Sequence, residues 1–144
     1  MNELAISPNQ TVMNAIEQTL LQLISERSRF TVRIGRMTQS LEQLQTRTGT
    51  ENDEVWEEML EKVIDQHDAV IKDLTTYVEG LDKELNLFRS GIVAARGVDD
   101  VDAKIMFLSY ILASMNVRLE DARTNREGYT EVFDQLQMMA AHWI

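Results

Sequence analysis

Apolar residues recur at alternating steps of three and four along most of this chain. The first series runs Met13, Ile16, Leu20, Leu23, Phe30, Ile34, Met37, Leu41 and Leu44, with Arg27 occupying one step. Such a repeat places one apolar stripe along an α-helix and is the heptad pattern of coiled coils. Ser7 and Pro8 suit a helix start, and the turn residues around Gly49 end the pattern. The pattern predicts a first helix over residues 8–46.

Two further series of the same kind follow. The second runs Trp56, Leu60, Val63, His67, Val70, Leu74, Tyr77 and Leu81, then slips by one residue to Leu85, Phe88 and Ile92. The third runs from Val101 to Trp143 with Arg126 inside it. Gly97 stands where a C′ glycine would end a helix, and Asp99 and Asp100 can cap the next one. We therefore expect a second helix over residues 52–95 and a third over 99–142.

The predicted fold is all-α and forms a single helical domain over residues 1–144. Short loops between long helices favour an elongated antiparallel three-helix bundle, up-down-up, with coiled-coil-like heptads. The second helix carries the widest apolar face and is expected to be central. The alternative is a splayed hairpin that completes its core by homodimerisation.

Three positions inside the apolar series carry a charged or titratable side chain: Arg27, His67 and Arg126. Counting outward from turns near Gly49 and Val98 puts all three at similar heights, with Arg27 opposite about position 71. We interpret them as a polar core layer that fixes helix register. The alternatives are a pH- or ligand-sensitive site around His67, or arginines that extend to solvent without forming a layer. Candidate acceptors for the arginines are Glu26, Asp65, Asp68 and Asp73.

An apolar cluster is expected where the third helix ends near the first turn. Its members are Trp56, Met138, Met139, Trp143 and Ile144. One interpretation is a closed end of the core, with the two tryptophans near one another. The other is a partner-binding tip, because methionines and aromatic residues suit adaptable docking surfaces.

Charge and composition change the picture mainly by exclusion. The net charge is −10, which argues against binding of nucleic acid or of anionic lipid. The second helix carries one candidate acidic stripe, formed by Glu54, Glu57, Glu58, Glu61, Asp65 and Asp68. No stretch is long and apolar enough to suggest membrane insertion, and the N-terminus lacks the pattern of a secretory signal. With no cysteine in the chain, a cytoplasmic location is expected.

Residue patterns for catalysis are missing from the sequence. The two histidines, His67 and His142, stand outside metal-ligand spacings, and no phosphate-binding or nucleophile motif occurs. We therefore expect no enzyme activity, no cofactor and no metal. The expected function is a protein–protein interaction module, such as a helical adaptor, chaperone or assembly subunit, with other proteins as partners and a homodimer favoured. The alternative is an acidic inhibitor or nucleic-acid mimic that blocks a basic surface.

Overall fold

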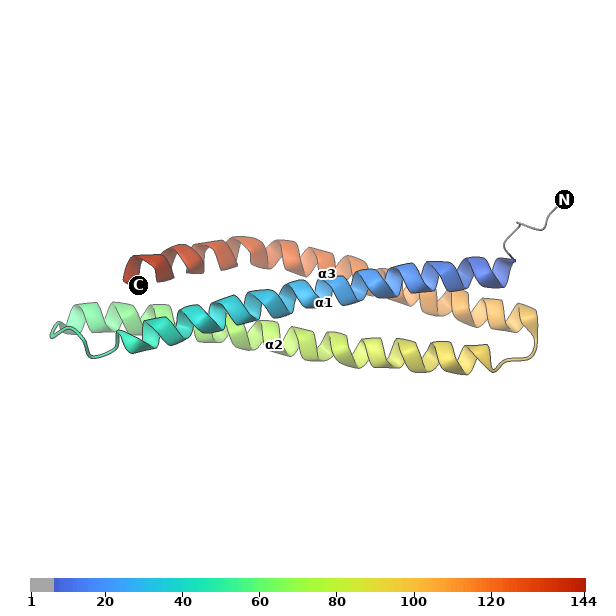
Figure 1. Cartoon of the computed structure of the whole chain (residues 1–144), viewed down its shortest axis with the longest axis horizontal. Coiled ribbons are helices and arrows are strands. Elements are labelled where there is room, and N and C mark those ends of the chain that lie inside the picture. The colour runs from blue at the N-terminus through green and yellow to red at the C-terminus, as the bar shows by residue number, and fades with distance from the viewer. Residues whose placement is uncertain (1–6) are drawn as a thin grey trace. The chain divides into compact units, whose positions relative to one another are not determined.

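A computed structural model describes residues 7–144 of the chain. The three predicted helices are present: α1 spans Pro8–Thr46, α2 spans Glu54–Arg96 and α3 spans Val101–Trp143 (Figure 1). No strand occurs among residues 7–144. The chain is therefore all-α, and the contacts between its helices are those of a three-helix bundle.

Side-chain caps fix where the helices begin. Ser7 Oγ accepts a hydrogen bond from the backbone N–H of Gln10 at 3.1 Å, which leaves Pro8 as the first residue of α1. Asp53 Oδ1 accepts the backbone N–H of Val55 at 3.0 Å, and Asp100 Oδ1 accepts that of Asp102 at 3.3 Å. These caps satisfy N–H groups that have no partner within the helix. Because the caps themselves lie outside the helices, α2 and α3 begin at residues 54 and 101, two positions later than predicted.

The two connections between helices differ in their backbone. Gly49 has φ +76°, a left-handed conformation that glycine adopts at no steric cost, and its N–H donates to Glu57 Oε1 at 2.9 Å. Gly97 was expected to play the same role and does not, since Gly49 is the only positive-φ residue among those described. Instead the N–H of Gly97 donates to the carbonyl of Ala94 at 3.2 Å, which tightens the last turn of α2.

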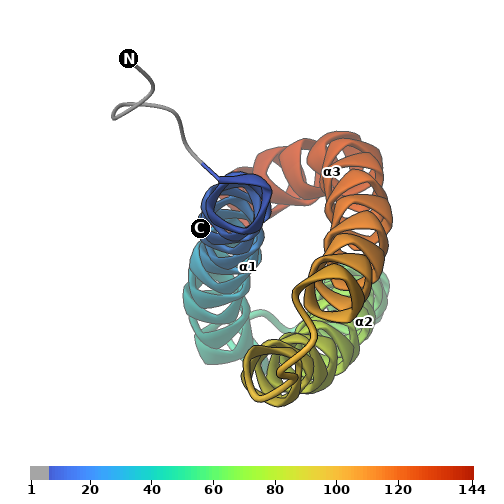
Figure 2. The ribbon, with the colours of Figure 1, turned by 90° about the vertical axis from the view of Figure 1, so that its right-hand side faces the viewer.

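The described chain divides into two compact units, and each helix contributes one segment to each unit. Unit 1 comprises residues 1–27 and 80–124, of which residues 1–6 lie outside the described part. Unit 2 comprises residues 28–79 and 125–144. In unit 1 the end of α2 lies beside the start of α3, and the two are joined by a short turn (Figure 2).

Polar pairs join α1 to α3 at intervals of seven residues. The pairs are Thr19–Asn116 and Glu26–Arg123 in unit 1, and Arg33–Thr130 and Ser40–Gln137 in unit 2. In every pair the α3 residue follows the α1 residue by 97 positions, so within each unit the two helices run in the same direction. A repeat of seven residues returns a side chain to nearly the same face of a helix, which is why successive pairs meet in one register.

The α2 segments run opposite to the other two. In unit 1, Arg118 of α3 pairs with Glu84 of α2, while a Cβ added at Gly91 would lie 3.2 Å from Cδ1 of Ile111. The residue numbers rise on one helix as they fall on the other. Each unit is therefore an up-down-up arrangement of three helical segments, as predicted for the bundle.

The predicted apolar series supply both cores. Buried residues of unit 1 include Ile16, Leu23, Leu81, Leu85, Leu108 and Met115. The first core cluster of unit 2 is formed by Phe30, Met37, Leu74 and Leu136. The ring of Phe30 lies 4.9 Å from that of Tyr77, between centroids. Burial of these side chains removes them from water and is the main stabilising contribution to each unit.

Candidate functional site

A cluster of tryptophan and methionine side chains lies in unit 2, where the start of α2 meets the end of α3. The buried core beneath it consists of Leu44, Leu60, Val63 and Ala140. Trp56, Ile64, Met139 and Trp143 pack against that core and remain partly exposed. We call Trp56, Met59, Met138, Met139, Trp143 and Ile144 the Trp–Met cluster.

The two tryptophans of the cluster are in contact. Their ring centroids are 5.2 Å apart and the rings are inclined at 65°, an edge-to-face arrangement. Aromatic pairs favour this geometry because the positive edge of one ring meets the negative face of the other. The proximity of Trp56 and Trp143 expected from the sequence is thus present.

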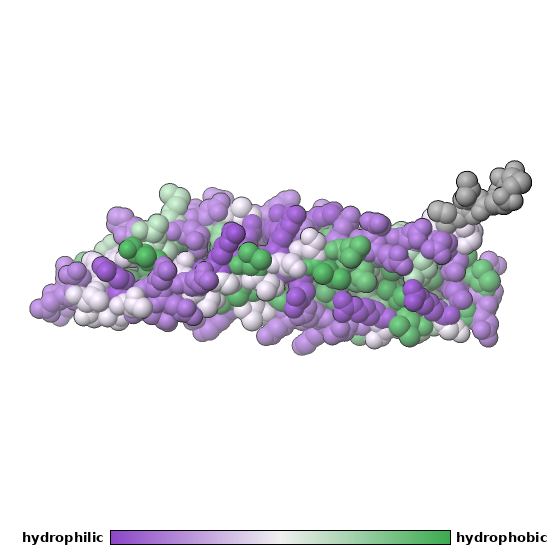
Figure 3. Space-filling view, viewed as in Figure 1, coloured by the Kyte–Doolittle hydropathy of each residue, from purple (hydrophilic) through white to green (hydrophobic). Residues whose placement is uncertain are grey.

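The Trp–Met cluster also borders open space. A cavity of about 600 Å³ is lined by Trp56, Met59, Val63, Met138, Met139, His142 and Trp143. Met59 is 53% exposed and Met138 is 75% exposed, and Ile144 is also exposed. The space-filling view shows hydrophobic areas within a mainly hydrophilic face (Figure 3). The cluster therefore closes the core on one side and presents apolar side chains to solvent on the other.

Three residues that line this cavity were not among the predicted members of the cluster: Met59, Val63 and His142. Met59 and Val63 follow Trp56 at helical spacings of three and seven, so the apolar periodicity contained the signal. His142 lines the cavity because it precedes Trp143, and the two rings lie 6.4 Å apart, between centroids.

The residues of the predicted acidic stripe have different surroundings. Glu57 is half-buried and its carboxylate accepts a hydrogen bond from the N–H of Gly49, so it stabilises the turn between α1 and α2. Asp68 pairs with Lys72 at 2.8 Å; the hydrogen bond and the charge of Asp68 raise the pKa of this lysine. Glu54, Glu58, Glu61 and Asp65 are exposed. A binding role for this stripe stays a prediction.

Arg27, the first member of the predicted polar layer, pairs with Asp82 of α2. Its Nη2 donates to Asp82 Oδ2 at 3.1 Å, and its Nε makes a second bond to the same carboxylate. The hydrogen bond and then the charge of Asp82 raise the pKa of the Arg27 guanidinium. Asp82 was not among the predicted acceptors, and the predicted register, with Arg27 opposite about position 71, is not the one found. Glu26 was among those acceptors, but it is buried beside Arg123.

His67 and Arg126, the other two predicted members, lie in unit 2. His67 is fully buried, and its Nδ1 lies 2.8 Å from the carbonyl oxygen of Val63. A carbonyl only accepts, so Nδ1 carries the proton, and Nε2 has no hydrogen-bond partner within residues 7–144. Arg126 is half-buried, and its carbonyl accepts a bond from Arg33 at 3.0 Å. None of these contacts joins two of the three, and the shared layer stays a prediction.

Arg33 is a structural residue that the sequence did not single out. Besides the Arg126 carbonyl it binds the hydroxyl of Thr130 at 2.7 Å, and its guanidinium lies 5.4 Å from the ring centroid of Phe133. These three contacts fasten α1 to α3 in unit 2. The available signal was the seven-residue spacing of Glu26, Arg33 and Ser40 beside the apolar stripe.

Among residues 7–144, no group of three or more metal-ligating side chains is close enough to hold an ion. Within the same range, no helix combines the length and apolar character needed to cross a membrane. In comparisons with known proteins, no family model matches this chain, and no characterised protein or solved structure is similar enough to count as a relative.

Proposed function

We propose that this protein is a non-catalytic protein–protein interaction module and that the Trp–Met cluster is its contact surface. The cavity beside Trp56 and Trp143, with exposed methionines around it, is the observation that supports the proposal. Methionine side chains adapt to irregular partners, and aromatic residues supply much of the binding energy at protein interfaces. A cytoplasmic location, in keeping with the cysteine-free sequence, is part of the same proposal.

The exposed area gives a scale for the binding energy. Full burial of a methionine side chain stabilises by about 1.5–3 kcal/mol. From the exposed fractions of Met59 and Met138, covering both would contribute roughly 2–4 kcal/mol before the cost of association. Loss of either contact is therefore large enough to measure. The same surface would serve a second copy of the chain, so we include homodimerisation among the interactions proposed.

The test compares two variants with matched exposure in unit 2. Met59 and Val32 are both 53% exposed, and only Met59 lines the cavity. Proteins captured from an extract by the wild-type chain are identified, purified and titrated against each variant by calorimetry. We expect Met59→Glu to weaken binding at least tenfold and Val32→Glu to leave it within twofold. Equal affinities for both variants would show that the Trp–Met cluster is not the contact surface.

Salt dependence separates this proposal from an acidic inhibitor. Apolar contacts persist at about 1 M salt, whereas attraction between exposed charges is screened over about 3 Å there. We expect the captured partner to remain bound under that condition. Complete release would favour the acidic surface instead. Sedimentation of the chain alone at two concentrations then reports whether a second copy occupies the cluster.

A further inference from the structure

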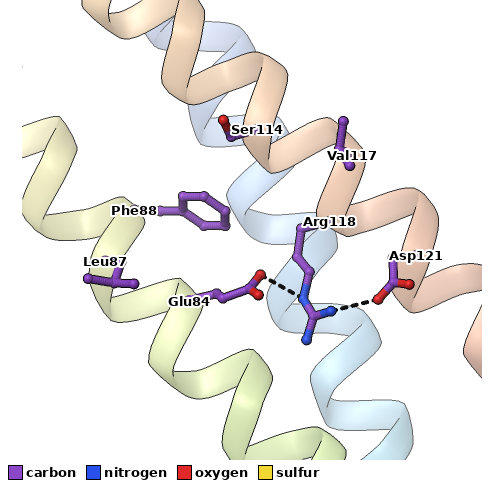
Figure 4. Close-up of a pocket in the computed structure, with 7 residues that line it drawn as sticks. All are labelled: Glu84, Leu87, Phe88, Ser114, Val117, Arg118 and Asp121. Atoms are coloured by element: carbon purple, nitrogen blue, oxygen red, sulfur yellow. Dashed lines mark hydrogen bonds and ion pairs between the residues drawn. The ribbon is translucent and has the colours of Figure 1, made fainter.

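A groove runs between α2 and α3 in unit 1, apart from the Trp–Met cluster. Two cavities lie along it, of about 530 and 320 Å³. The larger is lined by Glu84, Leu87, Phe88, Ser114, Val117, Arg118 and Asp121, and Phe88 reaches from α2 toward α3 within it (Figure 4). The smaller is lined by Gly91, Ala94, Ala95, Val98, Phe107, Tyr110 and Ile111. We call the two together the α2–α3 groove.

The groove is bordered by residues at heptad spacing on both helices. The outer line on α2 is Leu87, Gly91 and Ala94, with Val98 following just after the helix ends. The line on α3 is Phe107, Tyr110, Ser114, Val117 and Asp121. Along each line, successive residues are three or four positions apart. This apolar pattern is separate from the one that forms the core. Side chains spaced in this way create holes into which the side chains of another helix fit. The shape of the groove therefore suits an α-helix.

Large exposed apolar side chains border the groove on both helices. Between them, Gly91 of α2 lies under the side chain of Ile111 of α3, because a Cβ added at Gly91 would lie 3.2 Å from Ile111 Cδ1. Leu87 is 69% exposed, and Tyr110 and Val117 are exposed to a similar extent. A helix in the groove would cover these three side chains. At 1.5 Å per residue, the line from 107 to 121 accommodates about four turns of helix, roughly 21 Å.

Acidic residues outnumber basic ones by three to two at each end of the groove. Arg118 is held between Glu84 and Asp121, at 2.8 and 2.6 Å, so the positive charge of Arg118 is already paired. The next charged residues there are Lys83 and Glu120. At the other end, Val98 stands between Arg96 and the acidic residues Asp99, Asp100 and Asp102, and Lys104 follows them. An occupant with positive charge near its ends would complement both.

We propose that the α2–α3 groove binds an amphipathic helix of a partner protein that carries an apolar heptad stripe and basic residues near both ends. A second copy of this chain fits less well. Two-fold antiparallel packing would bring Asp99 and Asp100 of one copy toward Glu84 and Asp121 of the other, and each copy carries a net charge of −10. Like charges placed opposite one another disfavour such a pairing. This surface lies in a different unit from the Trp–Met cluster and goes beyond the function proposed above.

The test uses three synthetic helical peptides of 18 residues, a length of about five turns. The first has a leucine heptad stripe with lysines on its polar face and ends. The second has glutamate in place of every lysine, and the third keeps the lysines but scrambles the stripe. Binding of fluorescently labelled peptide to the full chain is followed by anisotropy. We expect the first peptide to bind at least tenfold more tightly than either of the others.

Matched variants locate the binding site. Leu87 and Leu21 are 69% and 62% exposed, both in unit 1, and only Leu87 borders the groove. Leu87→Glu and Val117→Glu should each weaken binding of the first peptide at least tenfold. Leu21→Glu and the cluster variant Met59→Glu should leave it within twofold. Circular dichroism confirms that each variant is folded.

Three results would overturn the proposal. Equal affinities for the lysine and glutamate peptides would show that the groove does not prefer a basic helix. Unchanged binding in both Leu87→Glu and Val117→Glu would place the peptide elsewhere. A wild-type dimer that Leu87→Glu dissociates, and that no peptide displaces, would assign the groove to a second copy. Because Met59→Glu leaves this assay unchanged, failure here is distinct from failure of the Trp–Met cluster as a contact surface.

Discussion

Replacing His67 by leucine is expected to stabilise the protein, although the residue is completely buried. The imidazole Nε2 has no hydrogen-bond partner within residues 7–144, and a buried polar group in that condition costs about 1–3 kcal/mol. The substitution loses the bond from Nδ1 to the Val63 carbonyl, worth about 1 kcal/mol. That carbonyl remains satisfied, because it also accepts the backbone N–H four residues later in the helix.

The net change is therefore a gain of up to about 2 kcal/mol in the free energy of unfolding. For a chain of this length it corresponds to a rise in Tm of up to roughly 8 °C. Urea unfolding of wild type and His67→Leu, followed by circular dichroism at pH 7, measures the difference. His142, the other histidine, is exposed, so His142→Leu is the matched control and should change stability by less than about 0.5 kcal/mol.

A loss of more than about 1 kcal/mol in His67→Leu would refute this reasoning, since it would show that the imidazole makes an interaction that leucine cannot replace. Such a loss would revive the interpretation of His67 as part of a register-fixing polar layer or of a ligand-sensitive site. A gain in the free energy of unfolding would show that His67 acts as a core residue and that no polar interaction of its imidazole is needed for stability.

Three further predictions concern contacts within single units. Arg33→Lys should lower the free energy of unfolding by about 1–2 kcal/mol, because an ammonium cannot reproduce the forked hydrogen bonds and ring contact of the guanidinium; urea unfolding measures it. Burial and then the charge of Asp73 raise the pKa of Tyr129. The folded state therefore favours the neutral phenol, and wild type should lose stability relative to Tyr129→Phe as pH rises above about 10; an unchanged difference between pH 7 and 10.5 would contradict this. Gly128→Ala should stabilise by about 0.5–1 kcal/mol, since a Cβ there meets nothing within 4 Å, whereas Gly49→Ala should destabilise because of its φ of +76°; thermal melts of the pair give the two signs.

Much of the fold could be predicted because the strongest physical signals are local. The apolar series determined which faces are buried, and the bounds of α1 agree with the prediction at both ends. The contact between Trp56 and Trp143 followed from the same periodicity combined with an up-down-up order. Hydrophobic burial is large and periodic, so it leaves a clear trace in the sequence.

The register between α1 and α2 could not be predicted in the same way. Glu57 binds the backbone of Gly49, which shows that the connecting segment lies along the first turn of α2. The turn residues alone do not predict the path of this connecting segment. The start of α2 therefore extends past the end of α1. Arg27 pairs with Asp82, whereas counting residues from the turn had predicted a partner near position 71.

The polar pairs between α1 and α3 were missed for a different reason. Each is a single hydrogen bond or ion pair, a contact worth about 1 kcal/mol, and polar residues at a seven-residue spacing also occur on exposed faces by chance. Only the partner sequence on α3, offset by 97 positions, makes the repeat recognisable. Exposed apolar lines such as that of the α2–α3 groove are hidden in the same way, because a wide apolar face in the sequence does not say which part the core will cover.

Hydrogen–deuterium exchange of the protein, alone and bound to a partner identified by capture, tests the central claim most directly. Residues 54–63 and 136–144 form helix ends beside the Trp–Met cluster, where amide groups of the free protein should exchange quickly. The account predicts that partner binding slows exchange in these two segments together. Slower exchange confined to other parts of the chain, with both of these segments unchanged, would contradict the assignment of the Trp–Met cluster as the contact surface.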